Sequence, residues 1–139
     1  MESEIDTNEI KLEEPPVIKQ EAKLEVVPEV SQKIDYDTFR KVEMKVATVL
    51  EAESVPGTDK LIKLILDLGT EKRQLVAGIA KSYAPADLIG KQVIVVTNLQ
   101  PRKLMGVESN GMILAAGEAA ESIVLLAVDR KVDNGLRVK

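Results

Sequence analysis

The side chains best suited to hold a ligand lie together in one polar run, residues 98–116, which separates two apolar segments. Arg102 and Lys103 supply two cations in this run, and Met112 adds an adaptable apolar side chain. Two glycines permit positive φ angles, which bring main-chain N–H groups close to a ligand. Two neutral polar side chains add hydrogen-bond donors. The glycines and the neutral donors are Gly106, Gly111, Ser109 and Asn110.

This combination of groups fits one kind of ligand better than others. Cations, accessible amides and an apolar contact can hold a phosphate backbone beside an unstacked nucleotide. They do not fit acid–base catalysis, because Glu108 has no partner carboxylate or imidazole within the run. A connection of this length in a small domain is usually either functional or disordered. From the residues alone, contact with RNA and a purely structural loop both remain open.

The composition excludes several classes of protein. The 139 residues include no Cys and no His. Disulfides, thiolate nucleophiles, the commonest general base and the commonest transition-metal ligand are therefore absent. The chain has no GxxxxGK phosphate loop and no dinucleotide fingerprint. Carboxylates, Lys, Tyr and Ser remain, but no pair of them stands at a recognisable catalytic spacing. We expect no catalytic residue, no metal site and no cofactor.

Charge and proline divide the chain into two parts. Residues 1–33 contain nine acidic and four basic side chains and three prolines, with no aromatic residue and no Gly. Such a composition cannot readily offset the entropy lost on ordering, so we expect a flexible acidic tail or linker. It is either a tether to another partner or an idle solvated tail. Residues 34–139 carry fourteen acidic and fifteen basic side chains. The acidic pI of the whole chain therefore says little about what the folded part contacts.

Short strands separated by turns account for most of residues 34–139. Over residues 42–50 the side chains alternate, and one face is formed by Val42, Met44, Val46, Thr48 and Leu50. Further strands are expected at residues 60–69, 73–79, 91–99, 111–117 and 122–128, of which 91–99 should be the most buried. Helical turns are expected after an Asp35 or Asp37 N-cap and within residues 80–91. This pattern is typical of a small all-β barrel or sandwich. Five or six strands in about 105 residues suit an OB-type barrel.

Two long stretches closely resemble a known family. They are KVEMKVATVLEAESVPGTDKLIKLILDLG at residues 41–69 and RQLVAGIAKSYAPADLIGKQVIVVTNLQPRKLMGVESNGMILAA at residues 73–116. With the terminal strands they resemble the tRNA-binding OB domain, for which NLxPxKLMGVESxGMILAA is a specific signature. This domain forms the C-terminal dimerising module or β chain of many bacterial and archaeal methionyl-tRNA synthetases. It also occurs in free-standing dimeric tRNA-binding proteins and in the endothelial monocyte-activating polypeptide family.

The resemblance covers residues 34–139 and implies a fold and a site. The implied fold is all-β, a five-stranded OB-fold barrel with short helical turns and a C-terminal extension. The flexible tail of residues 1–33 resembles the synthetase linker that leads into this domain. By resemblance the motif positions lie at a tRNA-contact surface, and Arg102, beside the motif Lys, adds a phosphate contact. The residues expected at this surface are Arg73, Asn98, Arg102, Lys103, Ser109, Gly111 and Met112.

The family implies a non-catalytic module that recognises the shape and backbone of tRNA, raises the tRNA affinity of a methionyl-tRNA synthetase and mediates dimerisation. The expected partners are tRNA, a second copy of the chain and a synthetase catalytic chain. The apolar residues 122–138 are a candidate seam, that is, the contact between the two copies of the homodimer. The alternative is a dimeric peptide-binding export chaperone of the same fold.

No apolar run reaches the roughly 18 residues that span a bilayer, and the acidic first residues do not resemble a signal peptide. We therefore expect a cytoplasmic protein without membrane contact.

Overall fold

The computed structural model describes residues 31–139, so most of the predicted tail lies outside the described residues. The helices are α1 (Tyr36–Arg40), α2 (Pro85–Leu88) and the 3-10 turn η3 (Ala120–Ser122). The long strands are β2 (Met44–Ser54), β3 (Ile62–Asp67), β4 (Lys72–Ala77) and β5 (Gln92–Val96). The short strands are β6 (Arg102–Leu104), β7 (Val107–Ser109), β8 (Met112–Ile113), β9 (Ala115–Ala116), β10 (Val124–Leu125) and β11 (Arg137–Val138).

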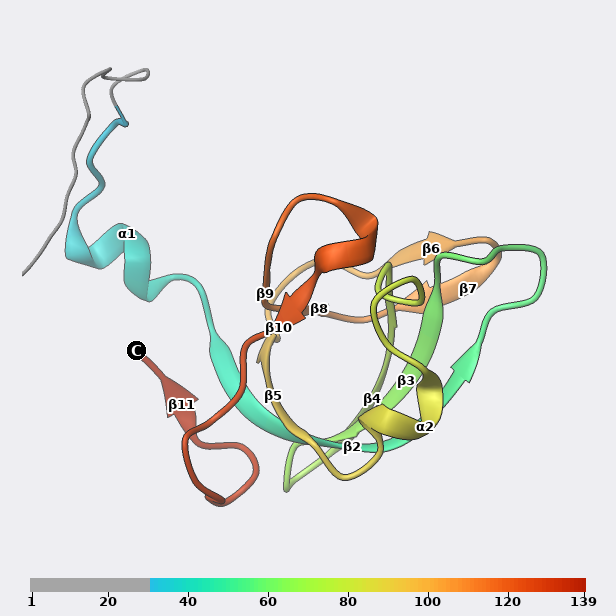
Figure 1. The fold of residues 1–139 in the computed structure, drawn as a ribbon. Helices are drawn as coiled ribbons and strands as arrows, with labels where there is room; N and C mark the ends of the chain where they lie inside the picture. The colour runs from blue at the N-terminus through green and yellow to red at the C-terminus, as the bar shows by residue number, and fades with distance from the viewer. Residues whose placement is uncertain (1–30) are drawn as a thin grey trace, which may run out of the picture. The chain divides into compact units, whose positions relative to one another are not determined.

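A curled β-sheet forms the body of residues 35–139 (Figure 1). Its strand order is β4-β3-β2-β5-β8, with β11 added to β2, and all of these neighbours are antiparallel. Two small hairpin sheets, β6–β7 and β9–β10, complete the fold. The five-stranded path confirms the predicted all-β, OB-type barrel. β11 belongs to the predicted C-terminal extension.

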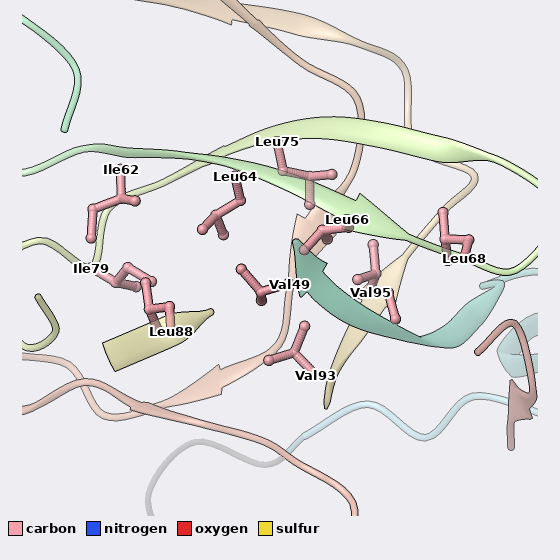
Figure 2. Packing of buried hydrophobic residues seen from close by; sticks show 11 residues of the cluster. Val49, Ile62, Leu64, Leu66, Leu68, Leu75, Ile79, Leu88, Val93 and Val95 are labelled. Carbon is pink, nitrogen blue, oxygen red and sulfur yellow. The ribbon is translucent and has the colours of Figure 1, made fainter. Parts of the chain in front are cut away.

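The interior of the curled sheet is filled by aliphatic side chains (Figure 2). The strand predicted at residues 60–69 is β3, whose alternate side chains Ile62, Leu64 and Leu66 are completely buried. Leu88 of α2 joins the same cluster. β5, predicted as the most buried strand, has four consecutive buried residues from Val93 to Val96. Full burial of one such side chain contributes about 1.5–3 kcal/mol, so this cluster is the main source of stability.

The first long strand, β2, packs on both of its faces. Sequence alternation grouped Val46 with Thr48 and Leu50, but the side chains in the barrel core are Ala47 and Val49. Val46 is buried outside that core cluster and exchanges backbone hydrogen bonds with Gly135 and Leu136, while Leu50 is 36% exposed. A β-bulge just after Val49 shifts the register there. The strand itself is confirmed. Alternation did not indicate which face meets the core, and the face that carries Thr48 lies against the C-terminal segment at Asn134.

The two helical turns begin and end where their sequences indicate. Asp35 caps α1, because its Oδ1 accepts a hydrogen bond from the Thr38 N–H at 2.8 Å. Hydrogen bonds from the Thr38 side chain and backbone hold the pKa of Asp35 below its usual value. Pro85 starts α2, where an N–H would have no helical partner. Gly90 follows with a φ of 90°, which side-chain-bearing residues rarely adopt.

Asn134 joins the C-terminal segment to the barrel. Its Oδ1 accepts hydrogen bonds from Thr48 Oγ1 at 2.7 Å and from Gln92 Nε2 at 3.0 Å. These two donors lie on β2 and β5. Gly135 then donates its N–H to the Val46 carbonyl at 2.7 Å, and β11 pairs with β2 beyond it. One amide side chain therefore fixes the segment that leads into the last strand.

Replacing Asn134 by Ala should loosen this connection. Thr48 Oγ1 and Gln92 Nε2 would lose their shared acceptor, so we expect the free energy of unfolding to fall by about 1–3 kcal/mol. Urea denaturation followed by circular dichroism measures the change. Asn110→Ala is the matched control, since among residues 31–139 Asn110 makes hydrogen bonds only through its backbone. It should alter stability by less than about 0.5 kcal/mol. Equal losses in the two variants would contradict the role given to Asn134.

Candidate nucleic-acid interface

The polar run predicted as a loop contains an ordered hairpin. β6 and β7 pair with Arg102 opposite Ser109 at the base. Two residues connect the strands, Met105 with a φ of 51° and Gly106 with a φ of 79°. Two consecutive positive φ angles are what a tight type I′ turn requires. The sequence did not predict this hairpin, because Met-Gly lacks the Asn-Gly or Asp-Gly signal of such turns.

The hairpin presents two cations to solvent. Arg102 and Lys103 are exposed, and neither forms an ion pair within residues 31–139. Four other basic side chains in that range pair with a carboxylate, namely Lys63, Arg73, Lys81 and Arg130, whereas most of the rest do not. Glu108 lies opposite Lys103 across the hairpin, yet neither Arg102 nor Lys103 is held in an ion pair by a residue of the described chain. They are free to meet an anionic ligand.

Ser109 lies beneath the hairpin surface. Only 4% of the residue is exposed, and its Oγ accepts a hydrogen bond from the Val76 N–H of β4 at 3.0 Å. The hydroxyl can in turn donate to the Gly111 carbonyl at 3.3 Å. Next to it, the Asn110 N–H donates to the Gln74 carbonyl at 2.9 Å. These bonds close the barrel between β4 and the chain that leads into β8. The geometry gives Ser109 a positioning role.

Arg73 is tied into the same edge of the barrel. Its guanidinium donates to the Thr97 carbonyl and, at 3.5 Å, to the Asn110 carbonyl. The Glu71 carboxylate accepts from Nε and Nη2 at 3.2 Å each. Arg73 thus links β4 to the end of β5 and to the residues before β8. Because Glu71 offsets much of its charge, the side chain holds the edge more than it attracts an anion.

Asn98 and Gly111 fix the chain on either side of the hairpin. Asn98 Oδ1 accepts from the Glu43 N–H at 2.9 Å, and its Nδ2 donates to the Lys41 carbonyl at 2.6 Å. Gly111 has a φ of 136°, and a Cβ there would lie 3.0 Å from the Val96 carbonyl oxygen. Only glycine fits that conformation and that space without strain. The two residues set where the hairpin leaves and rejoins the barrel.

A cavity of about 420 Å³ lies beside the hairpin. Some of the predicted site residues line it, namely Arg102, Ser109, Gly111 and Met112. Its other walls are mostly apolar and come from segments far apart in the sequence, including Leu61, Gly78, Leu99, Ile123 and Leu125. Sequence reasoning missed these walls, because no pattern along the chain shows that these segments meet.

The predicted site residues fall into two groups around one edge. Arg102, Lys103 and Met112 offer their side chains to solvent, and Met112 is 49% exposed. The others hold the backbone by hydrogen bonds or close packing, namely Arg73, Asn98, Ser109 and Gly111. We refer to residues 98–112 as the hairpin edge. It is the candidate interface of the protein.

The described residues lack two other kinds of feature. None of their helices is long and apolar enough to cross a membrane. Within residues 31–139, no three side chains of the types His, Cys, Asp and Glu gather in a way that could hold a metal ion. The groups that the hairpin edge offers to a ligand are its cations, its amides and the lining of its cavity.

A side chain at position 111 should disturb the closed edge. Gly111→Ala would place a Cβ against the Val96 carbonyl at an unfavourable φ. We expect the free energy of unfolding to drop by about 1–3 kcal/mol in chemical denaturation. Gly78→Ala is the matched control, because Gly78 lies outside the left-handed region and an added Cβ would meet only Leu61 Cδ2 at 4.0 Å. The control should be neutral or slightly stabilising. An unchanged midpoint for Gly111→Ala would refute the strain assigned to this position.

The chain matches a protein family over most of its length. The family model described as "Putative tRNA binding domain" matches residues 44–137. The methionine–tRNA ligase of Thermotoga maritima is 51% identical over 115 residues, which make up 83% of this chain and 18% of that protein. This chain spans less than a fifth of the length of the ligases that it matches.

Several solved structures share the fold. The MetRS-related protein from Pyrococcus horikoshii superposes with a TM-score of 0.74 and 44% identity, covering 78% of this chain and 100% of that one. The chaperone CsaA from Bacillus anthracis gives a TM-score of 0.71 with 30% identity, again over 78% of this chain and 100% of that one. With a barrel of this topology and a family model that covers residues 44–137, the chain belongs to the tRNA-binding domain family.

Proposed function

We propose that this chain is a non-catalytic module that binds tRNA through the hairpin edge. The observation that carries the proposal is the pair Arg102 and Lys103, exposed on an ordered hairpin without an ion pair among residues 31–139. Cations held in fixed positions bind phosphates, which supply most of the affinity in nucleic-acid complexes. Membership of the tRNA-binding domain family indicates which nucleic acid this is.

Contacts with the backbone suit a folded RNA better than an extended strand. The chain has only three aromatic residues, two Tyr and one Phe. Tyr36 and Phe39 lie on α1, on the other side of the barrel from the β6–β7 hairpin (Figure 1). Stacking of successive bases on aromatic rings is therefore not supported. Recognition rests instead on the shape and backbone of tRNA, with limited reading of sequence.

The predicted contact residues divide into those that bind and those that position. We assign direct contacts to Arg102, Lys103 and Met112, because their side chains reach solvent. We assign positioning roles to the residues whose side chains or backbone are already engaged within the barrel, namely Arg73, Asn98, Ser109 and Gly111. Removing a positioning residue should weaken tRNA binding by displacing the cations.

The module raises the tRNA affinity of a methionyl-tRNA synthetase in this proposal. Relatives at 51% and 54% identity are methionine–tRNA ligases, and the matched segment makes up 18% of their length. When a weak tRNA binder is joined to, or docked on, a catalytic chain, its contact becomes intramolecular. Avidity can then rise about 10²–10⁴-fold without any new catalytic group. We place this role in the cytoplasm.

The chaperone alternative is supported by one observation, the likeness to CsaA at 30% identity. The likeness to the MetRS-related structure is stronger, at 44% identity. The ligase relatives are more similar still, at 51% and above. These comparisons favour tRNA over an unfolded peptide. A labelled apolar peptide that saturates the protein when labelled tRNA does not would reverse this preference.

A homodimer would double the cations presented to one tRNA. Its formation is supported by exposed apolar side chains on and next to α1, where Tyr36 is 64% exposed and Phe39 and Val42 are also accessible. These residues border a groove that Val138 of β11 also lines. In the predicted seam, Val124, Leu126 and Leu136 are exposed as well. Clustered exposed apolar side chains of this kind mark interaction surfaces.

Removing the two hairpin cations should weaken tRNA binding. We expect Arg102→Ala/Lys103→Ala to lower affinity by at least about tenfold, since a hydrogen bond to a charged group contributes about 1.5–3 kcal/mol. The slope of log affinity against log salt concentration should become shallower by about two units, one for each lost phosphate contact. Fluorescence anisotropy with labelled tRNA at several salt concentrations measures both quantities.

Lys91→Ala is the matched control for lost charge. Lys91 is exposed and stands at the opposite end of β5 from the hairpin edge. Its removal should leave tRNA affinity within about twofold, because long-range interactions of exposed charges are screened by salt. If Lys91→Ala weakened tRNA binding as much as the double hairpin substitution does, the affinity would depend on the overall charge of the protein and not on the hairpin. A folded double variant with undiminished tRNA affinity would reject the proposed interface.

Substitutions on α1 should separate the two copies of a dimer. We expect Tyr36→Ser/Phe39→Ser to shift the sedimentation coefficient from dimer toward monomer, because the exposed apolar surface is lost. Val124→Ser/Leu126→Ser tests the seam predicted in residues 122–138. Dissociation of the second variant alone would move the interface to that seam. A wild-type chain that sediments as a monomer at micromolar concentration would exclude the homodimer.

A further inference from the structure

We propose that the cavity beside the hairpin binds one unpaired nucleobase of the RNA whose backbone the hairpin cations hold. The inference rests on the proposed function and adds a base-binding subsite to it. Arg102 belongs to both parts, since it is exposed on β6 and also lines the cavity. A phosphate held by Arg102 would therefore bring its own nucleoside to the mouth of the cavity.

The size and construction of the cavity suit a single nucleoside. Its volume of about 420 Å³ lies toward the lower end of the roughly 300–1,000 Å³ typical of small-molecule sites. A paired helix is too large to enter it. Val76, Ile79 and Ser109 line it and are themselves buried in the closed barrel. Its walls are thus preformed, and a preformed site binds without a large ordering cost.

The distribution of polar and apolar groups also matches a nucleobase. Most of the lining is apolar, and the base would cover Leu99 and Met112, which are 44% and 49% exposed. Arg102 and Gln100 supply hydrogen-bonding groups to the same cavity. The Gln100 side chain is exposed and makes no hydrogen bond within residues 31–139, so its donor and its acceptor are both available. A nucleobase has apolar faces and polar edges, which is the complementary arrangement.

An extended peptide fits the same cavity less well. A peptide that adds to a sheet needs a free strand edge of several residues. The bordering strands β8 and β10 are two residues long. β4 is longer, but its free edge already bonds Ser109 and Asn110. The unpaired charges of Arg102 and Lys103 at this edge also favour a ligand with an anionic backbone. The observations therefore favour a nucleotide.

The base should contribute modestly to affinity. The cavity lining contains no aromatic ring, so the base would lie against aliphatic side chains and the Met112 thioether. Stacking on an aromatic ring changes affinity by about 5- to 150-fold per base. We expect the lower end of that range here, about fivefold to tenfold.

Gly78→Leu fills the cavity and leaves both hairpin cations in the chain. An added Cβ at Gly78 meets only Leu61 Cδ2 at 4.0 Å, and both residues line the cavity. The longer side chain would thus occupy cavity space with little strain on the backbone. Ala86→Leu is the matched control, an exposed small-to-large change on α2 away from the cavity. Gln100→Ala is a second test at an exposed position where folding is not at risk.

The full 139-residue chain is titrated with two RNA stem-loops that differ at one bulged position. One carries 2-aminopurine there, whose fluorescence reports burial of the base, and the other carries an abasic site. The wild-type chain and Ala86→Leu should bind the 2-aminopurine RNA about fivefold to tenfold more tightly and change its fluorescence. Gly78→Leu and Gln100→Ala should reduce this preference, while the salt dependence of binding is retained.

Three results would overturn the inference. Equal affinity of the wild-type chain for the two RNAs, with salt-dependent binding intact, would remove the base subsite and leave the proposed function standing. An unaltered preference in a folded Gly78→Leu variant would place the base elsewhere. Binding of a labelled eight-residue leucine-rich peptide to wild type but not to Gly78→Leu, without a base preference, would assign the cavity to peptides. Absence of salt-dependent binding to tRNA and to both stem-loops would instead contradict the proposed function itself.

Discussion

The hydrogen bond from the Val76 N–H to Ser109 Oγ, 3.0 Å long, closes the barrel on which the hairpin edge is built. β4 and β8 are the two ends of the sheet path, so no regular ladder joins them. Gln74 completes the closure between β4 and the chain before β8. Its carbonyl accepts from the Asn110 N–H and its Nε2 donates to the Glu108 carbonyl, both at 2.9 Å. A buried polar group left without its partner costs about 1–3 kcal/mol. The position of the hairpin therefore depends on this small set of bonds.

Closure of the barrel divides the predicted site residues into those that position the hairpin edge and those that can bind tRNA. Ser109 and Arg73 are engaged with backbone groups, whereas Arg102 and Lys103 stand on the exposed strand of the hairpin. Residues 34–139 have only one more basic than acidic side chain, so local placement of charge matters more than net charge. A preorganised pair of cations loses less conformational entropy on binding than cations on a flexible loop. The cavity lies next to them because the same closure brings β4, β6 and β10 together.

Patterns within short segments of the sequence predicted the strands whose own residues determine which side chains are buried. The alternation of β3 and the apolar run of β5 each identified a buried strand. Alternation could not show which face of β2 meets the core, because the other face lies against a distant segment, where Asn134 accepts a hydrogen bond from Thr48. The motif drew attention to Ser109, but residue type alone cannot distinguish a buried hydroxyl that closes a barrel from an exposed one that meets a ligand. The cavity was not predictable, because Gly78 and Leu125 approach each other only after the barrel closes.

A double-mutant cycle for tRNA affinity tests most directly whether closure of the barrel acts through the hairpin cations. The cycle compares wild type, Ser109→Ala, Arg102→Ala/Lys103→Ala and the triple variant, each verified as folded by circular dichroism. If Ser109 only positions the cations, its removal should weaken tRNA binding in the wild-type background and have little further effect once the cations are gone. The resulting coupling energy should be about 0.5–3 kcal/mol. The same loss of affinity on Ser109 replacement in both backgrounds would show that Ser109 and the cations act independently, and would contradict this account.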